Sequence, residues 1–268
     1  MTMLVVIDIG NSKIKIGLYP NYPENTELDI LYFDNKISKL KEIPEGIANY
    51  IKSSNNKNFI NACIISSVVP NLNKDISCLI NNKFNVKPIF VNLDLNTGVK
   101  FNYNPVSDIG ADRIADSVAV NNLYPKNLHK IVIDFGTATV FEVISNNGNF
   151  LGGSIFPGLE IASKALAEKT SLLKDINFED LDSNQKIIGN STDESLKSSL
   201  FWGYISLTEG MVKKILDELK ITKEEAFIVG TGGFASLISN HVSIFDKIEP
   251  NLTLEGLRII YQLNYGKN

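Results

Sequence analysis

Leu4-Val5-Val6-Ile7-Asp8-Ile9-Gly10-Asn11-Ser12 is the stretch that decides the fold of this chain. Its apolar, β-branched run indicates a buried strand, which brings one carboxylate to a glycine turn followed by small polar side chains. The next stretch, Lys13–Tyr19, alternates polar and apolar residues, as a strand with one buried face does. The glycine turn therefore joins one strand to another, whereas Rossmann and Walker A loops lead from a strand into a helix.

The same pattern returns halfway along the chain, as Ile131-Val132-Ile133-Asp134-Phe135-Gly136-Thr137-Ala138-Thr139. A single aspartate at such a turn could simply cap backbone N–H groups. Two aspartates in matching contexts, each followed by glycine and hydroxyl residues, favour phosphate and metal binding. Bare glycine turns let the backbone approach phosphate oxygens closely. The repeat predicts a duplicated fold that binds a polyphosphate and its metal ion, as in an ATP-dependent phosphotransferase.

Two lobes with the same order of elements are predicted around these hairpins. Further strands are expected near 31–33, 62–69, 88–91, 150–155 and 226–229. Helices are expected near 44–52, 71–83, 111–123, 159–168, 193–219 and 253–264. This order predicts an α/β fold with mixed sheets and helices on both faces. We expect an N-terminal lobe over 1–124 and a C-terminal lobe over 125–268.

Composition limits the classes of partner. The chain has 268 residues, 44% of them hydrophobic, a net charge of −4 and a pI of about 5.4. Nucleic-acid binding needs a cationic excess that this chain lacks. No apolar run in the sequence approaches the length of a membrane span. The two histidines lie outside the motifs, which argues against a catalytic triad or a zinc site. We expect a cytoplasmic protein without nucleic-acid or membrane partners.

Two further motifs could carry chemistry. Gly110-Ala111-Asp112-Arg113 opens a predicted helix, where an acid is favoured by the helix dipole alone. Asp112 could instead act as a general base on a substrate hydroxyl. Arg113 could pair with a substrate carboxylate, or only with Asp116 on its own helix. Gly230-Thr231-Gly232-Gly233 follows a strand and fits either close packing or a loop that accommodates adenosine or ribose.

Taken in order, these motifs resemble those of type III pantothenate kinases from end to end, within the superfamily of acetate and sugar kinases, heat-shock chaperones and actin. Each motif is weak alone, and their order and spacing together are specific. The matching elements are Asp8–Ser12, Tyr103–Pro105, Gly110–Arg113, Asp134–Thr139, Gly152–Gly158, Thr192, Thr231–Gly233 and Leu252–Arg258.

The resemblance implies duplicated actin-like (ribonuclease H-like) lobes, a homodimer, and use of ATP, Mg²⁺ and a monovalent cation, K⁺ or NH₄⁺. It implies phosphorylation of pantothenate to 4′-phosphopantothenate, the first step of coenzyme A biosynthesis. Its site would use Asp112 as general base, Asp134 on the monovalent cation, Asp8 on Mg²⁺ and Thr137 on ATP. The ATP-phosphate hairpin would comprise Asp8, Ile9, Gly10, Asn11, Ser12, Lys13, Ile14 and Lys15. Pantothenate would be bound by Tyr103, Gly110, Ala111, Asp112, Arg113 and Thr192, the last from the neighbouring subunit.

The sequence departs from the family pattern at four positions. Val140 and Glu142 stand where Thr and Asp are usual, Ser191 replaces an Asn, and Ser12 replaces a Thr while keeping the hydroxyl. Strand alternation is expected to direct Val140 and Glu142 away from phosphate. Two alternatives stay open: a kinase for another small molecule on the same fold, and a nucleotide-binding accessory protein with a regulatory output.

Overall fold

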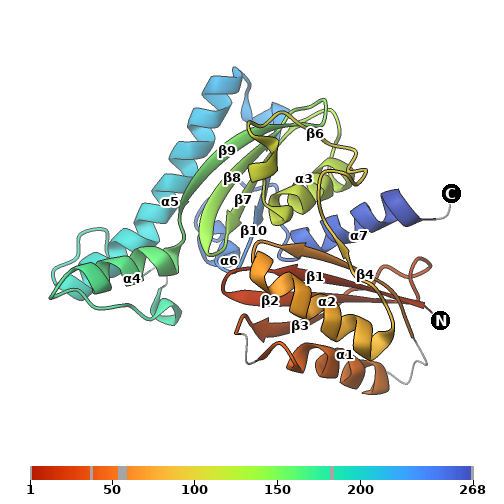
Figure 1. Ribbon diagram of the computed structural model, residues 1–268. Helices are drawn as coiled ribbons and strands as arrows, with labels where there is room; N and C mark the ends of the chain where they lie inside the picture. Colours follow the sequence, from red (N-terminus) through yellow and green to blue (C-terminus); the bar gives the residue numbers. More distant parts are fainter. Residues whose placement is uncertain (1, 37–38, 54–58, 182–183, 267–268) are drawn as a thin grey trace. The chain divides into compact units, whose positions relative to one another are not determined.

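The computed structural model describes residues 2–36, 39–53, 59–181 and 184–266 (Figure 1). The chain forms two compact units, here called the first unit (Met1–Asn122 with Leu252–Asn268) and the second unit (Leu123–Asn251). The first crossing between them lies two residues from the expected boundary after residue 124. The second differs from expectation, because the last helix belongs to the first unit.

The first unit is built on a five-stranded sheet with the strand order β3-β2-β1-β4-β5. β1 pairs antiparallel with β2 and parallel with β4, so the sheet is mixed. The strands of this sheet are β1 Thr2–Ile9, β2 Lys13–Pro20, β3 Asp29–Asp34, β4 Phe59–Ser67 and β5 Ile89–Phe90, and a short β6 at Lys100–Phe101 lies outside it. The helices are α1 Glu42–Ser53, α2 Pro70–Phe84, α3 Ala111–Leu123 and α7 Leu252–Tyr265, with a 3₁₀ turn at Val106–Asp108.

Helices pack on both faces of this sheet, as the sequence predicted. On one face, the odd-numbered residues of β1 form a buried core with α1 and α2, for example Ile7 with Ile47 and Ile76. The other face of β1 is covered by α7. Gly17 of β2 leaves room for the side chains of Val6 and Leu254 on this face, since a Cβ atom at its position would lie 2.7 Å from Val6 and 3.3 Å from Leu254.

The apolar residues of α7 explain why the last helix joins the first unit. Leu252, Leu254 and Leu257 are fully buried. Gly256 packs so closely on α3 that an added Cβ atom would lie 2.0 Å from the carbonyl oxygen of Ala115. Arg258 and Glu255 form an ion pair at 2.8 Å, and Glu255 also accepts a hydrogen bond from the Tyr19 hydroxyl at 2.9 Å. The helix therefore braces both the sheet and α3.

The second unit repeats the arrangement, with its strands in the order β11-β10-β7-β8-β9. β7 pairs antiparallel with β8 and parallel with β10, as β1 does with β2 and β4. The strands are β7 His129–Phe135, β8 Ala138–Ile144, β9 Asn149–Pro157, β10 Ala226–Thr231 and β11 Lys247–Ile248. The helices are α4 Leu159–Lys169, α5 Thr192–Leu219 and α6 Ala235–Ser239, with 3₁₀ turns at Phe178–Asp180 and Lys223–Glu225. The predicted α/β fold with mixed sheets in two related halves is confirmed.

The core of the second unit lies between the odd-numbered face of β7 and two helices. Ile131, Ile133 and Phe135 are fully buried and belong to one cluster with Leu200 and Phe201 of α5. Figure 1 shows α5 as the long helix of this unit, with α4 beside its N-terminal part. In the described part of the chain, no helix has both the length and the apolar composition needed to cross a membrane.

Candidate active site

The turn between β1 and β2 is held by backbone contacts and leaves its side chains exposed. Gly10 N–H donates to the carbonyl of Lys13 at 3.0 Å, which closes the hairpin. Asn35, just after β3, donates from its side chain to the Gly10 carbonyl at 2.5 Å and from its backbone to the Ser12 carbonyl at 3.1 Å. Asn11, Ser12 and Lys13 are exposed. Asn35 was not predicted, because a lone asparagine 25 positions away gives no signal in the sequence.

Asp8 lies near the end of β1, where burial disfavours the charged form of its carboxyl group. Its direct neighbours across the sheet are Lys15 on β2 and Ser66 on β4. Burial, and next the negative charge of Asp112, raise the pKa of the Asp8 carboxyl to about 6, against the opposing effects of Lys15 and Ser66. A carboxylate in such a place favours a cation beside it.

Asp8→Asn is therefore expected to stabilise the nucleotide-free protein at neutral pH. Since the folded-state pKa is raised, the folded protein holds more protons than the unfolded chain between pH about 4 and about 6. Stability contributed by the protonated carboxyl is thus lost as pH rises through this window. The shift corresponds to roughly 3 kcal/mol at pH 7.5.

Thermal unfolding of wild type and Asp8→Asn at pH 5 and pH 7.5 measures this effect. The variant should gain more at pH 7.5, whereas Asp94→Asn, at an exposed position of the same unit, should not. An equal change at both pH values would contradict the prediction.

Asp112 lies in the first turn of α3, in the same unit as Asp8. Its Oδ1 accepts the Arg113 N–H at 2.8 Å. Burial raises the pKa of Asp112, and Arg113 opposes this rise. Gly110 leaves the space that the carboxylate occupies, because a Cβ atom there would lie 2.3 Å from Asp112 Oδ1. The Arg113 guanidinium lies over the ring of Tyr103, 5.4 Å from its centroid. The first unit thus brings together Asp8, Lys15, Tyr103, Gly110, Asp112 and Arg113.

Asp8 could hold a divalent ion together with ligands supplied by a bound polyphosphate. Among the described residues, no group of three or more His, Cys, Asp or Glu side chains could hold a metal ion. Mg²⁺ commonly takes one or two carboxylates and completes its coordination with phosphate oxygens and water. Asp8 and a bound polyphosphate would meet this requirement.

Asp134 holds the matching position in the second unit. It lies directly opposite Val140 on β8 and beside Thr231 on β10. A Cβ atom added to Gly232, where φ is +89°, would lie 2.2 Å from Asp134 Oδ1, and one added to Gly136 would lie 3.3 Å from Oδ2. Two glycine turns therefore leave room for this carboxylate. Thr137, in the hairpin turn, is exposed.

The register of β8 against β7 decides which face of the sheet Val140 and Glu142 occupy. Residues directly opposite in an antiparallel pair share a face of the sheet. Val140 pairs with Asp134 and Glu142 with Val132, so both point to the face that carries Asp134. Alternation along β8 alone does not identify this face, because only the register with β7 fixes which residues lie on the side of Asp134. Glu142 is buried, with 2% of its surface exposed.

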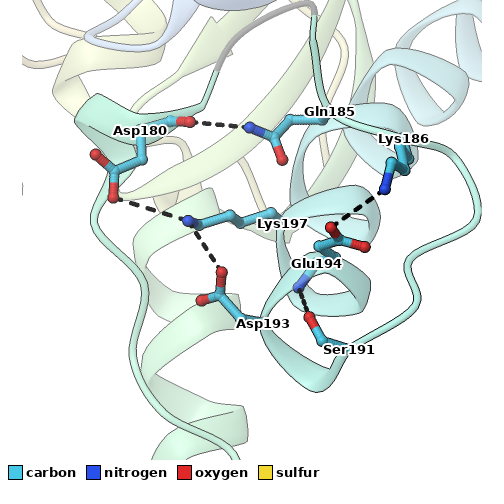
Figure 2. A network of polar contacts seen from close by, with 7 residues as sticks. All are labelled: Asp180, Gln185, Lys186, Ser191, Asp193, Glu194 and Lys197. Carbon is cyan, nitrogen blue, oxygen red and sulfur yellow. Dashed lines mark hydrogen bonds and ion pairs between the residues drawn. The ribbon is translucent and has the colours of Figure 1, made fainter.

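Thr192 begins α5 and lies in the second unit. The residue before it, Ser191, caps the helix by accepting the Glu194 N–H at 3.2 Å. Serine and asparagine are both favoured at this position, so the departure at Ser191 preserves the local structure. Figure 2 shows how the segment around the cap is tied to α5, with Lys197 between Asp193 at 3.0 Å and Asp180 at 3.8 Å, and Lys186 paired with Glu194 at 3.4 Å. Thr192 itself is exposed.

Comparison with known proteins connects this geometry to a family. The family model described as type III pantothenate kinase matches residues 4–214. A type III pantothenate kinase of Dehalococcoides mccartyi is 34% identical over 264 residues, covering 97% of this chain and 98% of that protein. Among solved structures, the ethanolamine utilization protein EutJ of Carboxydothermus hydrogenoformans has a TM-score of 0.56 at 14% identity, covering 96% and 89% of the two chains. The activator of 2-hydroxyisocaproyl-CoA dehydratase of Clostridium difficile, solved with bound ADPNP, has a TM-score of 0.51 at 11% identity, covering 95% and 91%.

The two kinds of likeness support different conclusions. The solved structures, at low identity, support the duplicated actin-like fold alone. The family model and the Dehalococcoides relative extend over most of the sequence, including both hairpins and the segment around Asp112. The chain belongs to the type III pantothenate kinase family.

Proposed function

We propose that Asp112 is the general base of this pantothenate kinase. Family membership gives the reaction, which is ATP-dependent phosphorylation of pantothenate in coenzyme A biosynthesis. The observation that carries the proposal is a carboxylate at the start of α3, with its pKa raised by burial, close enough to Asp8 for the two charges to interact. A base whose pKa is raised accepts a proton more readily at the working pH.

The reaction then needs one proton transfer within the protein. The primary hydroxyl oxygen of pantothenate attacks the γ-phosphorus of ATP, and the bond from this phosphorus to the β,γ-bridging oxygen breaks. The hydroxyl proton passes to Asp112 as the new P–O bond forms, and ADP leaves. The hydrogen bond from Arg113 N–H to Asp112 Oδ1 helps to fix the orientation of the carboxylate that would accept the proton.

Pantothenate would be bound by the segment around Asp112. The guanidinium of Arg113 carries donors in a fork that suits a carboxylate, and pantothenate has one. Tyr103 supports this guanidinium from one side. Gly110 and Ala111 would contact the substrate through their backbone, beside the carboxylate of Asp112. Thr192 would contribute its hydroxyl from the partner subunit.

ATP would bind to the first hairpin, and Mg²⁺ to Asp8. The exposed turn of Asn11, Ser12 and Lys13 offers N–H and hydroxyl donors to phosphate oxygens, and Lys15 adds a positive charge opposite Asp8. Thr137 would add a hydroxyl from the second hairpin. When bound, the divalent ion neutralises charge on the β- and γ-phosphates.

A monovalent cation, K⁺ or NH₄⁺, would bind at Asp134. Support comes from the carboxylate beside two glycine turns, where backbone carbonyls can approach an ion. Carboxylate and carbonyl oxygens are ligands that suit a hard cation.

A coupled assay of ADP release tests the reaction and the cation together. With ATP and Mg²⁺, ADP should form only when pantothenate is present, and K⁺ should stimulate it more than Na⁺ at equal ionic strength. Asp134→Asn should lose this K⁺ stimulation. If no pantothenate-dependent ADP formed, pantothenate phosphorylation would be contradicted, and a different small-molecule substrate or a regulatory role would be favoured. K⁺ stimulation that survives in Asp134→Asn would defeat the cation assignment alone.

We propose a homodimer formed through the second unit. Of the thirteen exposed large apolar side chains in the described residues, seven lie between 151 and 188. They are Leu151, Ile155, Ile161, Leu166, Leu172, Ile187 and Ile188. Exposed apolar side chains that gather in one patch are typical of interfaces, and a dimer would bury those of this segment. The segment 184–190 with Ile187 and Ile188 leads directly to Thr192, so a partner bound here would lie near that hydroxyl.

Size-exclusion chromatography with light scattering, which measures the molar mass of the protein in solution, tests the dimer. Wild type should give twice the 29.7 kDa of the chain. Ile155→Asp on β9 should shift the protein toward the monomer mass, and Leu263→Asp on α7 in the first unit should not. A monomeric wild type would contradict the proposal.

We also place the protein in the cytoplasm, where ATP is available, and recovery in a membrane fraction would contradict that placement.

A further inference from the structure

The turn that ends β4 contacts both the strand that carries Asp8 and the segment that carries Asp112. Val68 N–H donates to the carbonyl of Ile9 at 3.1 Å, so the turn is bonded to the strand that carries Asp8. Val68 Cγ1 lies 3.4 Å from the position of a Cβ atom on Gly110, next to Asp112. The Ser67 hydroxyl accepts the Val69 N–H at 3.2 Å and fixes the turn. Ser66, which precedes Ser67, is not one of the substrate, metal or catalytic residues proposed above.

Ser66 lies directly beside Asp8 in the parallel pairing of β1 with β4. Its side chain is fully buried, and its Oγ makes no hydrogen bond of ordinary geometry within the described residues. It is nevertheless close enough for its hydroxyl to lower the pKa of Asp8. A buried hydroxyl without a hydrogen bond is unfavourable, so a charged Asp8 offers it the acceptor it lacks.

The second unit places the same kind of residue in the same position. Thr231 lies directly beside Asp134 in the parallel pairing of β7 with β10, and it is 3% exposed. The two strand pairs correspond, because β1 and β7 each pair antiparallel with the next strand and parallel with a later one. Each half of the duplicated fold thus pairs its aspartate with a buried hydroxyl on the neighbouring parallel strand.

We propose that Ser66 is a positioning residue for Asp8, with its hydroxyl donating to the Asp8 carboxylate and holding it toward the Mg²⁺ of bound ATP. Carboxylates that bind metals are commonly held by such hydrogen bonds, and their loss lowers metal affinity or activity about 10–100-fold. Thr231 has the same relation to Asp134. The inference rests on the proposed role of Asp8 in binding Mg²⁺-ATP.

Removal of the hydroxyl tests the inference, with a matched control in the same unit. Ser66→Ala should raise the Mg²⁺ concentration for half-maximal activity about tenfold or more, with little change in KM for pantothenate. Calorimetry with a non-hydrolysable ATP analogue should show the same loss of Mg²⁺-dependent binding without turnover. Ser117→Ala on α3 removes another fully buried hydroxyl that lacks a hydrogen bond in the described residues, and it should leave the Mg²⁺ requirement unchanged.

Two conservative variants guard against misfolding as the cause. Ser66→Thr keeps the hydroxyl and should retain a requirement near that of wild type. Ser66→Cys keeps the volume but only a weak donor, and it should resemble Ser66→Ala. A wild-type Mg²⁺ requirement in Ser66→Ala or Ser66→Cys, or an equal shift in Ser117→Ala, would overturn the inference while the kinase reaction stood. An inactive wild type would instead point to failure of the proposed function.

Discussion

Asp112→Asn is expected to lower kcat for pantothenate phosphorylation by about 10²–10⁴-fold, the range that a positioned general base contributes. The amide keeps the shape of the side chain, and its oxygen can still accept the Arg113 N–H that Asp112 Oδ1 accepts at 2.8 Å. It cannot take up the hydroxyl proton. ATP binding should persist, because the phosphate hairpin lies on β1 and β2, and removing a negative charge near Asp8 does not weaken an anionic ligand. Steady-state kinetics and calorimetry with ATP measure the two effects separately.

A matched control is Asp108→Asn. Asp108 lies four residues earlier in the same unit, in an exposed 3₁₀ turn. Its loss removes the same charge from the neighbourhood without touching the proposed base, so kcat should stay within about twofold of wild type. Turnover like that of wild type in Asp112→Asn would remove Asp112 from the role of base. An equal loss in Asp108→Asn would show that net charge, and not proton transfer, is what the substitution changes.

Gly256→Ala is expected to reduce both stability and turnover, although alanine is the better helix former. The added Cβ atom would lie 2.0 Å from the carbonyl oxygen and 2.5 Å from the carbonyl carbon of Ala115. Both are backbone atoms, so α7 or α3 must shift. Overpacking of this kind costs about 1–3 kcal/mol, and a shift of α3 would displace Asp112 in its first turn. Thermal unfolding and kcat should fall together.

Gly210→Ala provides the comparison. Gly210 lies within α5, and a Cβ atom there would have no neighbour within 4 Å. The same substitution should therefore raise stability by up to about 1 kcal/mol through helix propensity. A Gly256→Ala protein as stable and active as wild type would contradict the claim that α7 fixes the position of α3. A similar loss in Gly210→Ala would point to a general intolerance of the helices.

The fold could be predicted to a large extent because its signals are local. The two Asp-x-Gly turns follow continuous β-branched runs, and the alternation over Lys13–Tyr19 identifies the second strand without tertiary information. Predicted 71–83 corresponds to α2 at Pro70–Phe84, and predicted 193–219 to α5 at Thr192–Leu219. Both segments have an apolar periodicity of their own, and α5 also begins with a capping serine, Ser191, which accepts the Glu194 N–H.

Features that depend on register and on distant packing could not be predicted. The place of α7 in the first unit follows from Gly256 fitting against Ala115, a contact between segments 141 residues apart. The shared face of Asp134 and Val140 follows from how β7 and β8 align. Ser66 and Asn35 meet the first hairpin only because β4 and β3 extend the same sheet. A single sequence contains the residues of such contacts but not their pairing.

The pH dependence of kcat/KM for pantothenate, at saturating Mg²⁺-ATP, tests the role of Asp112 most directly. The base must be deprotonated to act, and burial raises the pKa of Asp112 above its ordinary value. Wild type should therefore lose activity as pH falls through this raised pKa. The residual activity of Asp112→Asn should lack this acidic decline, while Asp108→Asn keeps it. An acidic decline of the same position and steepness in Asp112→Asn would contradict the account, because the titrating group would then be another residue.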